Sequence, residues 1–240
     1  MFRAVILSLA ASSLLSPFAV RASGQSAATA QSQPAAWEAA LQQRRAELVE
    51  KNGAGTDAAL RDQLLKMRDE DQAARGIAGG KSTGVTREMI KQIPATDTQL
   101  TVELKQIVAQ KGWPTIALVG IDASNGAMLL LTHTPDRAWR AQLLPQLQQL
   151  ADAGKIDASP LSFLVDKELV SEGKLQRYGS QFMAIGGKIA MYAVEDPAHL
   201  DDRRAAALLP PIHVYKQQMA SMYHVEVSPD VVMATAPAKK

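Results

Sequence analysis

Residues 124–133 read Ser-Asn-Gly-Ala-Met-Leu-Leu-Leu-Thr-His, and the helix that this stretch predicts sets the arrangement of everything around it. Ser124–Leu131 is apolar on all sides of such a helix, and a helix without a polar face has to be covered by other elements. We therefore expect this helix at the centre of the domain. It ends at His133, which places an imidazole at the edge of the core.

Segments with the 3.6-residue periodicity of half-buried helices flank this stretch on both sides. They cover residues 34–50, 57–75, 98–111, 136–153, 160–170 and 196–208, and a last helix begins near residue 212. Thr56 and Asp136 are good N-caps for two of them, and Pro145 is expected to kink or split the helix that contains it. Residues 115–121 fit either a buried strand or the lead-in to the central helix.

A β-hairpin is predicted late in the chain. Residues 178–185 and 188–194 are separated by Gly186-Gly187, a strong two-residue turn signal between two apolar runs. Residues 76–84 are interpreted as a loop, and residues 228–240, which contain two prolines, are expected to fray. The predicted fold class is therefore mainly α (α+β), a compact multi-helix domain with one small β-hairpin near residues 178–194.

The first 22 residues have the features of a secretory signal peptide. Arg3 precedes an apolar run from Ala4 to Val20, and Ala22 offers a cleavage site, with a cut a few residues later as the alternative. A membrane anchor is the rival interpretation, but the run is shorter than the ~20 apolar residues of a spanning helix and contains Pro17. We expect an exported protein, periplasmic or secreted in a bacterium, with no stable membrane span after cleavage.

Composition shifts along the chain suggest four segments. Residues 1–22 are the predicted signal peptide, and residues 23–33, rich in Ala, Ser and Gln, are a flexible leader. Residues 34–225 form a single helical domain, and residues 226–240 form a flexible tail.

Charge and composition exclude several function classes. The net charge is +2, and the whole excess belongs to Arg3 and Arg21 of the signal segment. A mature chain of zero net charge argues against a dedicated nucleic-acid binder. The absence of cysteine excludes thiolate metal sites, and the four histidines lack zinc spacing. No phosphate-binding or dinucleotide motif is present, so we expect neither a metal nor a cofactor.

His133 is the most prominent candidate for chemistry. An imidazole at the edge of a core can serve as a general acid or base, because its protonation changes near neutral pH. The alternative is a histidine that caps the end of the central helix through hydrogen bonds. Both interpretations stay open from the sequence.

A second polar cluster stands at the entry to the predicted hairpin. Gln176, Arg177, Tyr178 and Gln181 combine amide, guanidinium and phenol groups, which can hold a polar or anionic ligand through fixed hydrogen bonds. The alternative is a network that ties the hairpin to the helices through buried acids such as Asp166.

Asp71 continues an apolar stripe formed by Leu60, Leu64 and Met67, at spacings of one helical turn. A buried carboxylate is costly without a partner, and Arg75 lies four residues further on the same helix. We expect Asp71, Arg75 and Asp166 to form structural polar pairs.

Several motifs occur in an order that carries a resemblance. The most specific is Gln176-Arg177-Tyr178-Gly179-Ser180-Gln181, and Gly112-Trp113-Pro114 is a weaker one. Further matching positions include Asp71, Gln72, Arg75, Gly120, Ala123, Ser124, Ala127, His133, Leu164, Asp166, Glu195, Asp196, Pro197, Asp201, Arg203, Arg204, Leu209, Pro210 and Tyr215. From about residue 57 to residue 215 the chain resembles a family of bacterial proteins known only as a domain of unknown function.

The resemblance implies a shared fold and a shared pocket, but no reaction. It also implies that Arg204 turns inward and joins the ligand-binding set. Two departures stand out: family members usually have Gln-His-Ala-Asp where this chain has Thr-His-Thr-Pro at residues 132–135, and Arg where it has Lys167.

Two functions follow from these residues. The first is an exported, non-enzymatic domain that binds a small polar or anionic ligand or a partner protein. The second is a hydrolase or transferase in which His133 is the general acid or base and Arg177, Tyr178 and Gln181 hold the substrate. A carboxylate or Tyr178 beside His133 would favour the enzyme, provided that both groups open into a pocket.

Overall fold

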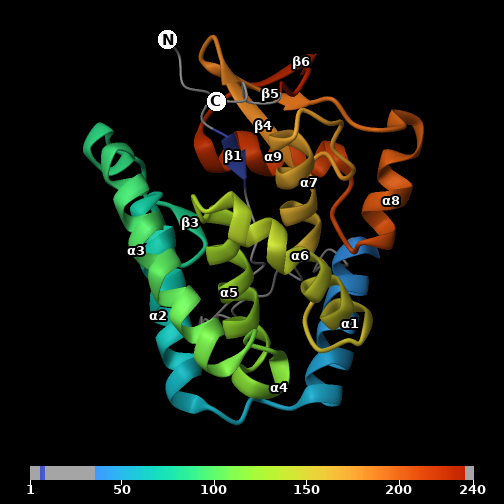
Figure 1. The fold of residues 1–240 in the computed structure, drawn as a ribbon. Helices are drawn as coiled ribbons and strands as arrows, with labels where there is room; N and C mark the ends of the chain where they lie inside the picture. Colours follow the sequence, from blue (N-terminus) through green and yellow to red (C-terminus); the bar gives the residue numbers. More distant parts are fainter. Residues whose placement is uncertain (1–5, 9–35, 236–240) are drawn as a thin grey trace, which may run out of the picture.

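The central helix of the computed structural model is α5, Ile121–His133, and ten of its thirteen residues are buried. The structure describes residues 6–8 and 36–235. Helices α2, Ala58–Ala74, and α3, Arg87–Lys111, pack against one side of α5, and α7, Leu161–Ser171, contacts it as well (Figure 1). The prediction of a central helix is confirmed.

The remaining helices complete the helical body. They are α1, Ala36–Asn52; α4, Ile116–Val119; α6, Arg137–Asp152; α8, Leu200–Ala206, which follows a 3-10 turn at Pro197–His199; and α9, Ile212–Tyr223. The predicted mainly α (α+β) fold class is confirmed.

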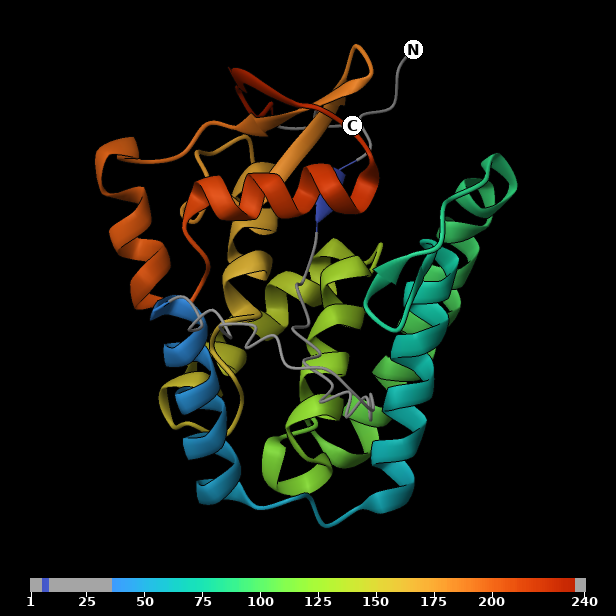
Figure 2. The ribbon, with the colours of Figure 1, turned by 180° about the vertical axis from the view of Figure 1, so that it is seen from behind.

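A four-stranded sheet lies at one end of this body, in the order β1-β4-β5-β6. Strands β4, Gln181–Ile185, and β5, Lys188–Tyr192, form the predicted antiparallel hairpin, with both turn glycines at positive φ. Strand β6, Val227–Val232, runs parallel to β5, and β1, Ile6–Ser8, pairs with β4. Helix α9 crosses beneath the sheet, between it and the helical body (Figure 2).

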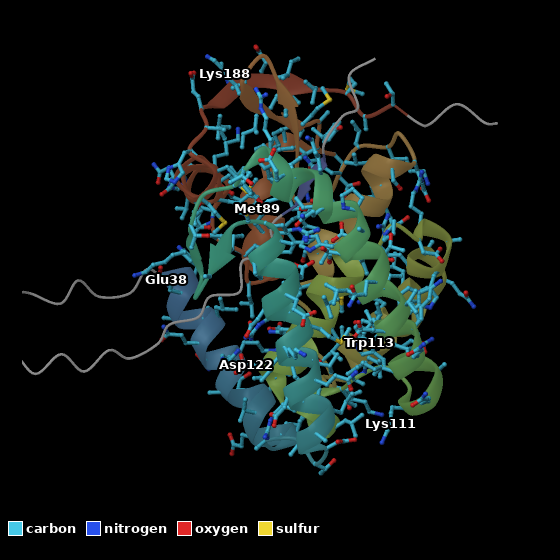
Figure 3. All side chains as sticks on the ribbon, turned by 90° about the vertical axis from the view of Figure 1, so that its left-hand side faces the viewer. Glu38, Met89, Lys111, Trp113, Asp122 and Lys188 are labelled. Atoms are coloured by element: carbon cyan, nitrogen blue, oxygen red, sulfur yellow. The ribbon has the colours of Figure 1, made fainter. Side chains whose placement is uncertain are left out.

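The described residues form two large hydrophobic cores and a small third cluster of Leu48, Ile116 and Ile121. One fills the helical body around α5, and the other lies under the sheet. Helix α7 contributes to both, because Leu164 faces the helical core whereas Phe163 contacts Tyr215 of α9 edge-on at a centroid distance of 6.0 Å. The long axis of the molecule is visible in Figure 3, where Lys188 of the hairpin and Lys111 of α3 lie toward opposite ends. Helix α7 therefore couples the sheet to the helices.

Helix α3 is longer than expected. The prediction that this helix starts at residue 98 is wrong, because it begins at Arg87 and runs through Pro94. Thr86 caps it by accepting a hydrogen bond from the Met89 N–H at 3.2 Å. Most side chains of the first three turns are exposed, so this part has no apolar stripe that periodicity could reveal.

The structure also decides three details of the other helices: the cap of α2, the effect of Pro145 on α6, and the conformation of residues 115–121. The side chain that caps α2 is Asp57, which accepts from the Leu60 N–H at 3.0 Å, and not Thr56. Asp136 caps α6 as predicted, but Pro145 does not split that helix. Residues 115–121 are the helical lead-in to α5, formed by the single turn of α4.

Two predicted irregular regions contain short strands. Residues 76–84 were expected to be a loop, and they contain the small antiparallel pair β2, Ile77–Ala78, and β3, Lys81–Ser82. The expectation of a flexible tail from residue 226 is wrong for β6. Pro229 is tolerated there because it lies where the register of β6 against β5 shifts. Apart from β1, the predicted signal peptide and leader lie outside the described residues.

Candidate functional site

The structure separates the candidate residues into two places. His133, Asp71 and Arg75 come together in the helical body, on α5 and α2. Gln176, Arg177, Tyr178, Gln181 and Arg204 lie around the hairpin and α8, beside Asp166 of α7.

Helix packing brings Asp71 and His133 together. The α2 stripe that ends at Asp71 is buried against α5, so the carboxyl group is carried into the interior with the apolar residues before it. His133 is the last residue of α5 and meets that carboxyl group from the facing helix. The side chains are 1% exposed for Asp71 and 7% exposed for His133.

The contact between them is a close hydrogen-bonded pair. His133 Nδ1 lies 2.8 Å from Asp71 Oδ1 and 3.0 Å from Asp71 Oδ2. An ionised carboxylate can only accept hydrogen bonds, so Nδ1 carries the hydrogen and Nε2 is the basic nitrogen of the neutral ring. This is the arrangement in which a carboxylate orients a histidine that transfers protons.

Further groups hold the Asp71 carboxylate in place. Arg75 Nη1 donates to Asp71 Oδ1 at 2.9 Å, and Gln72 Nε2 donates to Oδ2 at 2.9 Å. The other end of the Arg75 guanidinium donates to Asp97 of α3 at 2.8 Å. Burial alone would raise the pKa of Asp71, but His133 and Arg75 outweigh it and hold that pKa below its usual value. Asp71 is therefore a fixed anion at neutral pH.

Lys167 and Tyr223 adjoin this cluster, and both have displaced pKa values. The Lys167 ammonium donates to the Thr132 carbonyl, next to His133. Burial, followed by the charges of Arg140 and Arg75, lowers the pKa of Lys167 to about 7. Burial raises the pKa of Tyr223 on α9 to about 12. Perturbed pKa values are concentrated at functional sites, although structural ion networks produce them too.

Asp97, Lys167 and Tyr223 were not predicted as site residues. They come from α3, α7 and α9, and no local motif links them to His133. For Lys167 the sequence offers one signal, its departure from the family pattern.

The second group of residues is built around a buried carboxylate. Asp166 accepts three backbone hydrogen bonds, from the N–H groups of Arg177 at 2.7 Å, Tyr178 at 2.9 Å and Ser180 at 2.8 Å. We call this arrangement the Asp166 cradle. Burial raises the pKa of Asp166 above its usual value, and the three N–H donors offset part of the rise.

Gln176, Gln181 and Arg204 are used inside the fold. Gln176 bonds both ways across the start of β4, accepting from the Gln181 N–H at 2.8 Å and donating to the Tyr192 carbonyl at 2.6 Å. Arg204 is fully buried, donates to the Pro210 carbonyl at 2.6 Å and to the Tyr178 carbonyl, and stacks over Tyr215. These side chains tie the hairpin to α8 and α9, which is the structural alternative weighed above.

Arg177 and Tyr178 point elsewhere, to a surface pocket of about 280 Å³. Its lining residues come from α6, α7, α8 and the hairpin entry, and they are Gln148, Ala158, Leu161, Ser162, Val165, Arg177, Tyr178, Arg203, Ala206 and Ala207. Gln176, Gln181, Arg204 and His133 are not among them. The pocket and the His133 pair are therefore separate candidate sites, and this pocket does not meet the condition that His133 and its partner open into it.

Fold and site define a mainly helical domain with a buried histidine–carboxylate pair. Residues 58–228 match the model of a family of unknown function, DUF6624, and the chain belongs to that family. No curated protein and no solved structure matches the chain significantly.

Two further observations concern the described part of the chain. None of its helices combines the length and the apolar character needed to cross a bilayer. Within residues 6–8 and 36–235, His, Asp and Glu side chains do not gather in threes that could hold a metal ion.

Proposed function

We propose that this domain is a hydrolase or transferase in which His133 is the general acid or base. One observation carries the proposal: both Asp71 oxygens lie within 3.0 Å of His133 Nδ1, and Asp71 is itself held by Arg75 and Gln72. A base that is oriented by a fixed carboxylate is the core of many acid/base sites.

The chemistry assigns a role to each group. With the hydrogen on Nδ1, Nε2 accepts a proton from an attacking water or hydroxyl group and later returns it to the leaving group. Asp71 stabilises the imidazolium that forms in between and keeps the ring in one orientation. His133 and, to a smaller extent, Arg75 keep Asp71 ionised, because both lower the pKa of that carboxyl.

The helix-cap interpretation of His133 is less well supported. The backbone N–H of Thr134 already bonds to the Leu131 carbonyl at 3.3 Å and so closes the last turn of α5. The His133 ring instead reaches across to α2. Proton transfer by a positioned side chain typically accelerates a reaction by about 10²–10⁴-fold, so its loss is measurable.

Chromogenic substrates test this proposal directly. The purified full chain is assayed with the p-nitrophenyl esters of acetate and phosphate, alongside His133→Gln and Asp71→Asn. We expect each variant to lower kcat by about 10²-fold or more, because each removes the oriented base. His213→Gln is the matched control, since His213 is exposed and the same substitution there should leave kcat unchanged.

Two outcomes would overturn the proposal. One is hydrolysis that His133→Gln leaves intact, and the other is a wild-type rate no higher than that of free imidazole at equal concentration. Circular dichroism of each variant separates loss of the base from loss of the fold.

A second candidate function, binding of a small polar or anionic ligand, is favoured by the pocket beside Arg177 and Tyr178. Arg203 is held there by the carbonyls of Arg177 and Asp196, at 3.0 and 3.1 Å, and its guanidinium also forms an ion pair with the Asp196 carboxylate at 3.8 Å. Arg177 is half exposed, and its pairing with Glu195 at 3.3 Å is a surface contact that a ligand could replace.

Thermal unfolding in the presence of phosphate, acetate or benzoate tests this second function. A ligand that binds the folded state raises the melting temperature by mass action. We expect Arg177→Ala and Tyr178→Phe to abolish any such shift. Arg44→Ala, which replaces a partly exposed arginine on α1, should preserve it. A shift that survives both pocket variants places the ligand elsewhere and contradicts the assignment.

We also propose that the protein is exported after removal of residues 1–22. The support is the sequence of that segment, with Arg3, the apolar run and Ala22 in the order of a secretory signal. N-terminal sequencing of the protein from the periplasmic fraction of an expressing bacterium should give Ser23 as the first residue. A protein that retains Met1 in the cytoplasmic fraction would contradict export.

A further inference from the structure

The backbone on both sides of His133 is held by two cations, of which Arg140 is buried and Lys167 is partly buried. Lys167 of α7 donates to the carbonyl of Thr132, and Arg140 of α6 donates to the carbonyl of Thr134 at 3.2 Å. The two carbonyls belong to the residues immediately before and after the histidine. Neither cation touches the imidazole in these contacts, so their effect on it passes through the backbone.

Such support is needed because of where His133 stands. The last four carbonyls of a helix have no partner within the helix, and its final turn frays unless other groups bind them. Glycine, the usual terminator, is absent after His133, since Thr134 and Pro135 follow. A ring attached to a fraying turn would not keep a fixed distance to Asp71.

Both contacts depend on two adjacent residues of α7. Lys167 reaches the first carbonyl directly, whereas Glu168 forms a buried ion pair with Arg140, whose guanidinium reaches the second. Glu168 in turn accepts from the Ser171 hydroxyl at 3.5 Å. Helix α7 therefore acts on both sides of the histidine at once.

We propose that Lys167 and Arg140 are positioning residues that clamp the end of α5 and so fix the His133 imidazole against Asp71. The proposal rests on the proposed acid/base function, and it deepens it by assigning residues outside the pair. The charged groups around Lys167 are Arg140 of α6, Arg75 and Asp71 of α2, and Asp97 of α3.

The clamp explains why a cation is retained in a place where burial disfavours it. The cost of burial appears in the lowered pKa of Lys167, about 7. Arginine also donates to carbonyl oxygens and keeps its charge at any physiological pH. Either side chain can hold the Thr132 carbonyl, so Lys167→Arg is a conservative replacement that should rescue the function of the clamp.

Nuclear magnetic resonance of the histidine rings tests the clamp without any substrate. Long-range proton–nitrogen spectra of the ¹⁵N-labelled full chain should show the His133 ring in one tautomer, with hydrogen on Nδ1. In Lys167→Met we expect broadened or doubled His133 signals and amide exchange about tenfold faster at residues 131–134. Lys167→Arg should restore both readings, and Lys174→Met, on an exposed lysine, should change neither.

Unchanged His133 ring signals in Lys167→Met would overturn the proposal, as would Lys167→Arg behaving like Lys167→Met. If Lys167→Met does not fold, the same His133 spectra are recorded for Lys167→Gln and for Arg140→Lys. Lys167→Gln keeps a donor for the Thr132 carbonyl without the charge. Failure of the acid/base function is a separate result. In that case the ring is fixed by the clamp in the spectra while His133→Gln leaves hydrolysis unaltered.

Discussion

Two of the buried carboxylates of this domain, Asp71 and Asp166, are almost equally buried and yet differ in what surrounds them. Asp71 is 1% exposed and is bound by side chains that carry or can gain charge, His133 and Arg75. Asp166 is fully buried and is bound by three backbone N–H groups. The pKa of the first carboxyl is lowered, whereas that of the second is raised.

The difference separates a site that can do chemistry from one that shapes the chain. Backbone N–H groups do not titrate, so the three donors of the Asp166 cradle stay the same and hold the entry to β4 in one conformation. The partners of Asp71 include an imidazole and, nearby, the Lys167 amine, whose pKa of about 7 lets it change protonation near neutral pH. Burial of an acid alone is therefore a poor guide to function, and the nature of its partners is a better one.

Removal of the Asp166 cradle should have the largest effect on stability. Asp166→Ala leaves three N–H groups without an acceptor in a buried place, and each orphaned donor costs about 1–3 kcal/mol. We expect the free energy of unfolding in urea to fall by about 3–5 kcal/mol. Asp166→Asn is the matched control, because its carbonyl oxygen still accepts from part of the cradle and should recover about half of the loss.

A loss below about 1 kcal/mol in Asp166→Ala would show that water or another group satisfies the three donors, and the cradle would then be incidental. Because the hairpin carries no titrating partner for Asp166, neither variant should alter the ring signals of His133. A change in those signals would break the separation between the two regions.

The pH dependence of the free energy of unfolding should distinguish the charged cluster around Asp71 and Lys167 from the Asp166 cradle. Lys167 has a pKa of about 7 in the folded chain against 10.5 when unfolded, so the unfolded state binds the extra proton between those values. Stability then rises as pH increases through this window, at up to about 1.4 kcal/mol per pH unit. In Lys167→Met this rise should vanish, so the difference between wild type and variant changes between pH 7 and pH 9.5.

The measurement is urea unfolding at closely spaced pH values, kept below the pKa of Tyr223 at about 12 so that this phenol stays neutral in the folded state. Lys174→Met provides the control, because an exposed lysine should leave the pH profile of the wild type unchanged. Parallel profiles for wild type and Lys167→Met would mean that Lys167 stays fully charged in the folded chain, and would contradict the lowered pKa of its amine.

Much of the helical architecture could be predicted because it is local. Ser124–Leu131 lacks a polar face, and the stripe of α2 repeats at one helical turn, so both burial patterns are written in neighbouring residues. The Gly186-Gly187 turn likewise predicts its own hairpin. The exposed start of α3 and the strand β6 could not be found this way, since β6 is formed by parallel pairing with a distant strand.

The candidate site could likewise be predicted only where its residues lie close together in the sequence. Asp71 stood out because it is an acid on an apolar stripe, and its partner Arg75 lies one turn away on the same helix. Lys167 and Asp97 could not be linked to them, because only the packing of α7 and α3 brings their side chains near. For Gln176 and Gln181 the residue types suggested a ligand, whereas backbone groups inside the fold take up their hydrogen bonds.

Replacement of the Arg177 side chain should have the smallest effect on stability. It distinguishes the contribution of the guanidinium from that of the backbone N–H that Asp166 binds. Asp166 binds the N–H of Arg177, which alanine also has, while the guanidinium is half exposed and pairs with Glu195 at 3.3 Å. Surface pairs of this kind contribute about 0–1 kcal/mol, so Arg177→Ala should change the free energy of unfolding by less than about 0.5 kcal/mol. Arg177→Pro removes the N–H itself and should destabilise the chain far more, by about 2 kcal/mol or above. If alanine were as damaging as proline in urea unfolding, the guanidinium would be part of the structural network, and the pocket that it lines would lose its standing as a separate binding site.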